Sequence, residues 1–409
     1  MNKIAEYIKS KHGNFCLRRE PVEFPMSFHD SIYQVNESHW NEVQKIEGNL
    51  YLSYYYLKAL EDSQQNIAFR YILFYKNNKP AAIAYVQVLE VKLSDSIKDV
   101  FCSPMNFGKE LFGGKESKFF VCGNVFSSGE NGFAYTSDLS QEEAYKALMT
   151  GIYRLRRAEK VLGEVSSVIL KEFWEKNFDT LSVIKKYDYR DFEIEPNLVM
   201  KINSEWNTLD DYIDDITKKY RKKYKDVMKK SEAISKVDLT VEQILFHSQK
   251  IKELFDAVHE KADFKFGHFD ASGFHNMKKS LGEQFIFKAY FLNDEMLGFA
   301  ALFNNSGILD ANYVGLNYEL NTTHCIYHRM LFDFVQVAMD KKCKELHYGR
   351  TASEIKSSIG AVPVNMKIFI RHRNTLSNKL IKPLLKLIQP SPFEQRNPFK
   401  EGVLVAAES

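Results

Sequence analysis

The chain has 409 residues, and 56 lysines and arginines against 53 aspartates and glutamates give it a net charge of +3. This near balance excludes a polycation that coats nucleic acid, and a content of 44% hydrophobic and 14% aromatic residues excludes a disordered chain. At the usual size of about 150 residues per domain, the length indicates two or three domains. The five cysteines form no C-x-x-C pair, which favours buried free thiols over disulfides or a metal site.

The sequence shows no pattern of a membrane anchor or of a secretory signal. Residues 1–19 are polar and charged, without an apolar stretch of signal-peptide length. The longest apolar run, Ala81–Leu89, is well short of the roughly 18 residues that a membrane helix needs. We therefore expect a cytoplasmic protein without a transmembrane segment.

The first half of the chain predicts a helix, a hairpin, a second helix and a strand. Residues 53–62 have helical character and precede two β-rich runs, Phe69–Tyr75 and Ala81–Val88, which are separated by a short turn. That is the pattern of a β-hairpin. Gln141–Lys160 follows with apolar residues three and four positions apart, as in an amphipathic helix, and Glu164–Leu170 has the composition of a strand.

The second half repeats this order, with a helix at 272–281, a hairpin at 285–303, a helix at 324–341 and a strand at 345–348. Such self-similarity indicates a duplicated unit. Antiparallel strands followed by a β-α-β crossover predict a mixed, mainly antiparallel sheet flanked by helices. We therefore predict an α/β (α+β) fold with two tandem units. The predicted boundaries are 1–203 for the first domain, 236–376 for the second and 377–409 for a C-terminal tail.

Between the two units, at 204–235, the sequence predicts a basic bridging helix that spans residues 208–235. Its first turns are acidic and its later turns carry eight lysines and arginines, the charge order that the helix dipole favours. We expect Tyr220 to face inward and Arg221 to border a cleft. Two interpretations stay open, namely a solvated linker helix and a cationic face that holds an anionic substrate.

The run from 310 to 360 holds the densest set of candidate site residues. Gly349 directly follows a predicted strand, where a glycine lets the backbone turn or approach a ligand closely. Arg350 has the planar fork that suits a carboxylate or a phosphate.

A short helix is predicted directly after Arg350. Thr351 and Glu354 have the T-x-x-E spacing of a capping box, and Lys356 lies about one turn into the helix. We expect Lys356 to be exposed at the mouth of a groove between the units, because open α/β sheets bind ligands beyond the carboxyl ends of their strands. The alternative is a capped surface helix whose charges have no function.

Four segments, YRKKYK, NYVGLNYELN, IYHRMLFDFV and YGRTASEIKSSIG, make residues 40–374 resemble a group of bacterial proteins. These are the tandem GNAT-like N-acyltransferases of the BioF2-like and Fem-type group. The resemblance implies transfer of an acyl or aminoacyl group from an activated donor, such as acyl-CoA, to an amine acceptor. It matches Lys356, followed by Gly360, to a lysine at the Fem-type transfer site, and Arg221 to a basic region that holds substrate. The glycine-containing pyrophosphate loop of ordinary GNAT enzymes is present in neither half.

On this resemblance we assign roles to the candidate residues. Lys356 would stabilise an oxyanion or a leaving group, and Tyr313 would handle a proton. Glu354 would orient Lys356 or Arg350, or act as a base. The candidate substrate-binding residues are Gly349, Arg350, Thr351, Tyr327, Arg221 and Tyr220.

No metal and no tightly bound cofactor are expected. His324 and His328 have the spacing of metal ligands on a helix but lack a third ligand in the sequence pattern. Acyl-CoA, an acyl carrier protein and aminoacyl-tRNA are the candidate donors, and nucleic acid is otherwise not an expected partner. The candidate acceptors are a small molecule and a lipid or cell-wall precursor. The alternative function is a non-catalytic module of the same fold that recognises a glycan, a lipid head group or a peptide.

Overall fold

A computed structural model describes residues 24–92, 116–261, 268–385 and 393–403. Residues 1–19, in which we expect no secretory signal, lie outside these ranges. Within them, every helix is too short or too polar to cross a membrane.

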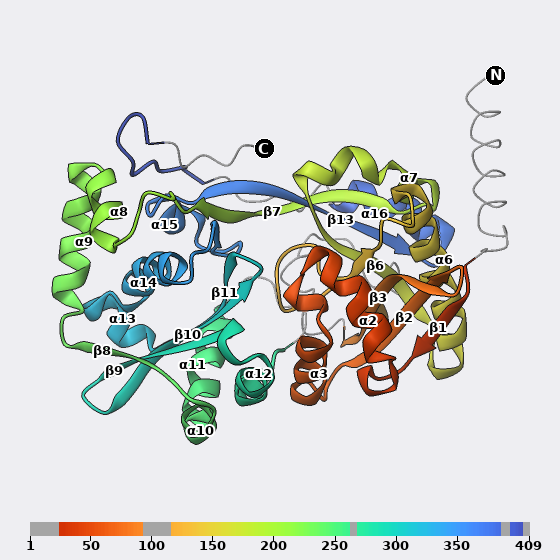
Figure 1. Ribbon diagram of the computed structural model, residues 1–409, viewed down its shortest axis with the longest axis horizontal. Coiled ribbons are helices and arrows are strands. Elements are labelled where there is room, and N and C mark those ends of the chain that lie inside the picture. The colour runs from red at the N-terminus through yellow and green to blue at the C-terminus, as the bar shows by residue number, and fades with distance from the viewer. Residues whose placement is uncertain (1–23, 93–115, 262–267, 386–392, 404–409) are drawn as a thin grey trace.

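The described strands form one sheet that runs through two lobes (Figure 1). In the first lobe the strand order is β1 (Met26–His29), β2 (Ala68–Lys76), β3 (Lys79–Lys92), β4 (Glu116–Cys122) and β6 (Val165–Trp174), with β5 (Phe133–Tyr135) paired to β3. In the second lobe the order from the outer edge is β8 (Ile234–Asp238), β9 (Phe285–Leu292), β10 (Glu295–Asn305), β11 (Ile308–Leu316) and β12 (Glu345–His347).

Helices cover both faces of this sheet. Those of the first lobe are α2 (Glu37–Glu47), α3 (Tyr54–Ser63), α6 (Gln141–Glu159) and α7 (Ser182–Lys186). Those of the second lobe are α8 (Leu209–Asp215), α9 (Lys218–Lys230), α10 (Val241–Phe246), α11 (Ser248–Glu260), α12 (Phe274–Leu281), α13 (Tyr318–His324), α14 (Ile326–Asp340) and α15 (Ser353–Ser357). The C-terminal α16 (Thr375–Leu385) returns to the first lobe and packs there on the sheet.

The two predicted hairpins occupy equivalent places in the two lobes. β2, β3 and β4 are antiparallel neighbours, and β4 then pairs in parallel with β6. β9, β10 and β11 repeat this arrangement, and β11 pairs in parallel with β12. α6 and α14 make the corresponding crossovers. This confirms the predicted fold class, whereas the predicted domain boundaries stay a prediction.

The last strand of each half pairs with the other lobe. β7 (Arg190–Lys201) follows β6 in the chain but pairs with β12, and β13 (Val362–His372) follows β12 but pairs with β6. β7 and β13 also pair with each other, so their antiparallel ribbon runs across both lobes (Figure 1). The lobes are therefore joined by exchanged strands.

The single bridging helix predicted over residues 208–235 is wrong. The chain is extended at Ile216, which pairs with Phe399, and a new helix starts after Thr217. The carbonyl of Pro398 accepts a hydrogen bond from the Thr217 amide at 2.8 Å, so the C-terminal segment imposes the break. The apolar spacing continues through the break and gives no sign of it. α9 packs on α13 and α14 at the far end of the second lobe, away from the ribbon.

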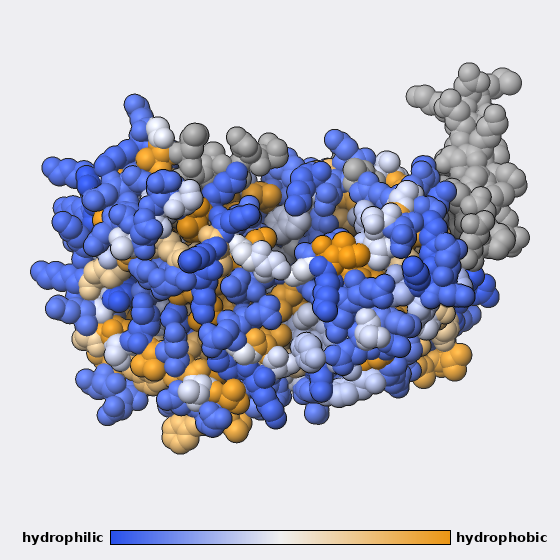
Figure 2. All heavy atoms as spheres, in the orientation of Figure 1, coloured by the Kyte–Doolittle hydropathy of each residue, from blue (hydrophilic) through white to orange (hydrophobic). Residues whose placement is uncertain are grey.

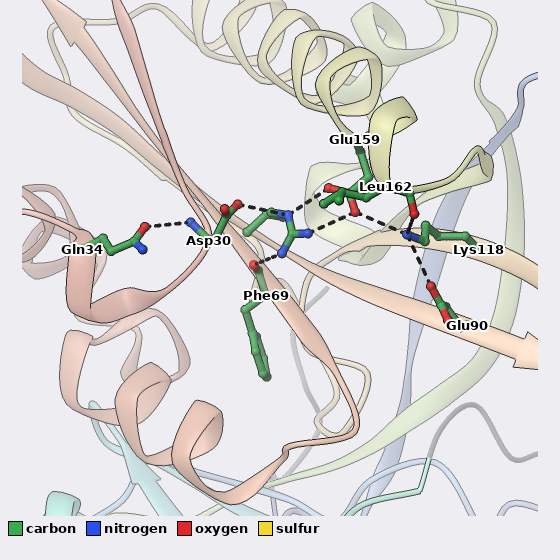
Figure 3. Close-up of polar contacts among 8 residues, drawn as sticks. Asp30, Gln34, Phe69, Glu90, Lys118, Glu159 and Leu162 are labelled. Atoms are coloured by element: carbon green, nitrogen blue, oxygen red, sulfur yellow. Dashed lines mark hydrogen bonds and ion pairs between the residues drawn. The ribbon is translucent and has the colours of Figure 1, made fainter.

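A cluster of charged side chains lies in the first lobe at the end of α6 (Figure 3). Arg70 donates two hydrogen bonds to the Glu159 carboxylate, at 2.9 and 3.0 Å, and Lys118 lies 3.4 Å from the same carboxylate. Both members of the Arg70–Glu159 pair are buried. Lys118 and Val165 are registered partners near the amino ends of β4 and β6, so this cluster lies opposite the carboxyl ends of those strands.

A second buried network lies at the parallel pair of β11 and β12. His347 is 3.3 Å from Asp310 and 3.0 Å from Glu345. Burial opposes its charge, but the hydrogen bonds to Asp310 and Glu345 prevail and raise the pKa of His347 to about 9. Asp310 also accepts a hydrogen bond from Tyr51 of the first lobe at 3.0 Å, so this network ties the two lobes together.

Candidate active site

Lys356 is a buried lysine on α15, the short helix that follows β12, and it is only 3% exposed. The expectation of an exposed lysine is therefore wrong. Its ammonium group makes no hydrogen bond or ion pair within the part of the chain that the structure describes. Burial, and then the nearby Arg350, lower the pKa of Lys356 to about 7. The amine thus exists in both protonation states near neutral pH.

The backbone before α15 turns Lys356 back toward the end of β12. Gly349 has a φ of +78°, which favours glycine, and its carbonyl accepts a hydrogen bond from the Leu198 amide of β7 at 3.1 Å. A side chain at Gly349 would begin 3.9 Å from the Lys356 Nζ. The predicted capping box is wrong, because the helix is preceded by Ala352 in a left-handed conformation and no side chain caps it. Thr351 is exposed.

The C-terminal segment holds the other end of this run in place. Gly360 has a φ of +115°, and a side-chain carbon there would lie 2.4 Å from the Phe399 ring. The Arg396 amide donates to the Ser357 hydroxyl at 3.1 Å, next to Lys356 in the chain. The close packing of Phe399 thus explains why a glycine stands at position 360. Gly349, in contrast, lies beside the Lys356 amine.

The first lobe contributes a buried carboxylate, Glu172 of β6, to the same place. One of its oxygens lies 3.2 Å from Arg350 Nη1 and 2.7 Å from Lys171 Nζ, and the other accepts a hydrogen bond from the Gly129 amide at 2.8 Å. Burial opposes its ionisation, but Lys171 and then Arg350 outweigh it and lower the pKa of Glu172. Burial in turn lowers the pKa of Lys171 to about 8.

A β-bulge brings Lys171 and Glu172 to this position. The register of β6 against β13 shifts between Leu170 and Phe173, so these two residues face a single residue of β13. Glu172 has a φ of +50°, a strained conformation for a residue other than glycine. The sequence carries no signal for this bulge, since the partner strand comes from the other half of the chain.

Two cations, Lys171 and Arg350, therefore contact one carboxylate in the β6 bulge, and a third, Lys356, lies near Arg350 after β12. Lys171 and Arg350 share Glu172, and Lys356 has no partner of its own among the described residues. An anion at this place, or negative charge that develops during a reaction, would be stabilised and would raise the pKa of Lys356. The cluster has the electrostatics of a site that stabilises negative charge.

Two predicted catalytic residues, Glu354 and Tyr313, lie away from the Lys356 amine. The Glu354 carboxylate is on the outer side of α15, where Arg396 Nη2 is 2.6 Å away. Tyr313 is buried in a phenylalanine-rich core and stacks on Phe269 at 4.6 Å between ring centroids. Neither contacts Lys356. Tyr327 packs at the start of α14 against the core of the second lobe, and burial raises its pKa.

The basic helix α9 reaches the site region through a residue that the sequence reasoning did not single out. Arg221 lies 3.8 Å from Asp214, and Tyr220 packs against the core of the second lobe. Lys223 instead donates a hydrogen bond to the Ser358 hydroxyl at 3.1 Å, just after α15. Figure 2 shows mainly hydrophilic side chains over the end of the molecule that carries α8 and α9.

The described residues hold no group of three or more His, Cys, Asp or Glu side chains that could bind a metal ion. His328 is partly buried, and burial and then Lys223 lower its pKa to about 4. It is therefore neutral at physiological pH.

Comparison with known proteins identifies a fold but no sequence family. No protein-family model matches the chain, and no curated protein matches it in sequence. The crystal structure of FemX matches 88% of this chain and 99% of its own, with 13% identical residues and a TM-score of 0.53. A tandem GNAT protein from the clavulanic acid biosynthesis pathway matches 86% and 99% of the two chains, with 7% identity and a TM-score of 0.50. The chain therefore has the fold of FemX and of a tandem GNAT protein, as the resemblance predicts.

Proposed function

We propose that the protein is an N-acyltransferase that moves an acyl or aminoacyl group from an activated donor to an amine. The observation that carries this proposal is Lys356, a buried amine with a pKa of about 7 that makes no hydrogen bond or ion pair to any residue the structure describes. A buried ionisable group without a partner is unfavourable for folding, and such groups cluster at functional sites. The fold shared with FemX and a tandem GNAT protein supports transfer chemistry as the function.

In the proposed reaction the amine nitrogen attacks the carbonyl carbon of the donor, and the carbonyl oxygen becomes an oxyanion. The bond to the leaving group then breaks, the leaving group keeps the bonding electron pair, and it takes up the proton that the nitrogen loses. Protonated Lys356 donates a hydrogen bond to the oxyanion or to the leaving group. Loss of one such donor lowers kcat by about 10²–10³ in other enzymes.

Arg350 and Glu172 act together in this proposal. Glu172 fixes the orientation of Arg350 through the 3.2 Å contact, while the Arg350 side chain keeps 31% of its surface exposed. The exposed part of the guanidinium binds an anionic part of the donor. We leave Glu354 and Tyr313 out of this mechanism, because the structure does not bring them to Lys356.

The net positive charge of the cluster fits a donor that carries phosphate. Acyl-CoA, acyl carrier protein and aminoacyl-tRNA all have phosphates and stay the candidate donors. The acceptor in this proposal is an amine on a small molecule or on a lipid or cell-wall precursor. We place the reaction in the cytoplasm, where such donors are made.

The test is a transfer assay with purified protein, a panel of acyl-CoA thioesters and charged tRNAs, and a pool of amines, read by mass spectrometry of the amide products. Lys356→Met should abolish product formation, whereas Lys222→Met, an exposed lysine of α9, should not. Product from Lys356→Met at the wild-type rate would refute the role of this residue.

The alternative is a non-catalytic binding module, and one observation favours it. The pyrophosphate loop of ordinary GNAT enzymes is missing from both halves. A thermal-shift screen separates the two functions, since a bound ligand raises the melting temperature by mass action. Stabilisation by a glycan, a lipid head group or a peptide, without any amide product in the transfer assay, would establish the alternative.

A further inference from the structure

The first lobe contains a pocket to which the proposed function assigns no ligand. It has a volume of about 170 Å³ and lies where β4 and β6 separate, beyond their last paired residues, Cys122 and Leu170. The start of α6 forms one side of it. Six residues define the character of its lining, namely Glu47, Glu130, Phe133, Tyr135, Tyr145 and Phe173.

Two carboxyl groups face this pocket, and no cation among the described residues forms an ion pair with either. Glu130 accepts hydrogen bonds from the Trp174 amide at 2.7 Å and from Asn177 at 2.6 Å, both through one oxygen, Oε1. Its other oxygen has no hydrogen bond in the described part of the chain. Desolvation, and then the charge of Glu130, raise the pKa of Glu47 to about 7, while Lys176 acts against them. A positive charge between the two carboxylates would remove this mutual repulsion.

The rest of the lining is an aromatic cluster that suits a cation. Phe133 and Tyr135 are stacked at 5.7 Å, and Tyr145 lies 5.8 Å from the first ring and 6.4 Å from the second. Phe173 lies 6.3 Å from Tyr145 on another side. Aromatic faces attract ammonium groups within about 6 Å. Tyr145 is 95% buried, and its hydroxyl makes no hydrogen bond to any described residue, which leaves it free for a ligand.

The same surroundings disfavour an anion. The amino end of α6 is already capped, because the Ser140 hydroxyl accepts from the Glu143 amide and Glu143 accepts from the Ser140 amide. Glu142 adds a further acid in the first turn. A phosphate here would meet negative charge instead of free amides. Lys171 also lines the pocket, but its amine is held by Glu172 and by the Ser127 carbonyl.

We propose that this pocket binds the ammonium group of a small organic cation, and that this cation is the amine acceptor of the proposed transfer reaction. The second part rests on the proposed function. Lys171 lines the pocket and shares Glu172 with Arg350, so the pocket adjoins the candidate active site. An acceptor held by one ammonium group must present a second amine to the donor, which defines diamines and diamino acids as its class. Only the second, uncharged amine forms the amide bond and loses a proton.

The binding test uses 1,5-diaminopentane as the probe, in isothermal titration calorimetry at pH 8 and low salt, with 1,5-pentanediol as the uncharged control. The diamine should bind and the diol should not. Glu47→Gln and Glu130→Gln should each weaken binding at least tenfold, and Tyr145→Phe should weaken it severalfold. Glu142→Gln removes a nearby acid that does not line the pocket, and it should bind as the wild type does. The glutamine at 130 keeps the oxygen that accepts from Trp174 and Asn177, and thermal melting verifies folding.

Affinity for the probe should also fall as the pH is lowered below about 7, because Glu47 then takes up a proton. The charged groups that act on it are Glu130 and Lys176, and Lys171 lies in the same lining. The proposal would be overturned if the wild type did not bind the diamine, or if Glu47→Gln and Glu130→Gln both bound it as tightly as the wild type.

One further variant and two outcomes of the transfer assay distinguish this proposal from the proposed function. Lys356→Met should bind the diamine like the wild type while it loses transfer. If the diamine binds but only monoamines are acylated, the acceptor assignment is wrong while the transfer function stands. If the diamine binds and no amine is acylated by the wild type with any donor, the transfer function fails and the ammonium pocket stands.

Discussion

Replacement of Lys356 by methionine should stabilise the protein while it abolishes transfer. Methionine has nearly the volume of lysine but no charge, so the substitution removes a buried amine without a cavity. The folded state lowers the pKa of this amine from 10.5 to about 7. In the unfolded chain at pH 7 the lysine is fully protonated. Because its pKa falls by more than three units on folding, the equilibrium constant for folding at this pH is lower by a factor of more than a thousand. This corresponds to about 4 kcal/mol of lost stability, since each tenfold change is about 1.4 kcal/mol.

The sign of this effect depends on pH. A lysine with a lowered pKa destabilises the folded state most below that pKa, and the penalty disappears as the pH rises through the pKa of the unfolded chain. We therefore expect urea unfolding at pH 7 to give Lys356→Met a higher free energy of unfolding by about 1–4 kcal/mol. The gain should shrink below about 1 kcal/mol at pH 10.

The matched control is Lys222→Met on the exposed face of α9, which should change stability by less than about 0.5 kcal/mol at either pH. Lys356→Arg should not restore transfer, because a guanidinium stays charged and is larger than an ammonium group. Destabilisation of Lys356→Met by the same amount at pH 7 and pH 10 would refute the reasoning from a buried charge. It would show that the aliphatic part of the lysine matters through packing alone.

Three further substitutions test the framework around the site. His347 has a raised pKa, so its contribution to the free energy of unfolding is complete below about pH 6.5 and is lost as the pH rises through about 9. In urea unfolding over this pH range, the free energy of unfolding of the wild type should fall by on the order of 3 kcal/mol more than that of His347→Gln. Glu159→Ala leaves the buried guanidinium of Arg70 with the exposed Asp30, 3.3 Å away, as its remaining carboxylate. It should lower the free energy of unfolding by about 3 kcal/mol in a denaturant titration, and a loss below about 1 kcal/mol would contradict the importance of the buried pair. Gly360→Ala adds a carbon 2.4 Å from Phe399 at a φ of +115°, so we expect a lower melting temperature and weaker transfer. An unchanged melting temperature would show that the C-terminal segment does not hold α15 in place.

The elements that the sequence predicts well are those with a local pattern. The hairpin over Phe69–Val88 and the helix at Gln141–Lys160 depend on alternation and helical spacing within a short stretch, and both are present as β2, β3 and α6. The repeat of these elements in the second half then gives the fold class. The break at Ile216 was not predictable in this way, because it depends on a segment nearly two hundred residues further along the chain.

The candidate site likewise combines residues that a local sequence pattern predicts with residues that no local pattern predicts. Gly349, Arg350 and Lys356 lie in one short run, and the structure brings these three together. Glu172 and Lys171 had no signal, because a bulge against β13 places them and β13 lies far away in the sequence. Glu354 has the right spacing for a role beside Lys356, but Arg396 from the C-terminal segment binds it on the other side of the helix.

The exchange of β7 and β13 explains why the site contains residues from both lobes. β13 fixes the position of the Lys171–Glu172 bulge in the first lobe, and β7 holds the turn at Gly349 in the second lobe through the Leu198 amide. These two strands are paired to each other along the ribbon, so the bulge and the turn are held at a fixed separation by backbone hydrogen bonds. The contact between Arg350 and Glu172 therefore joins a bulge and a turn that the same pair of strands positions, an arrangement that favours preorganised charge stabilisation.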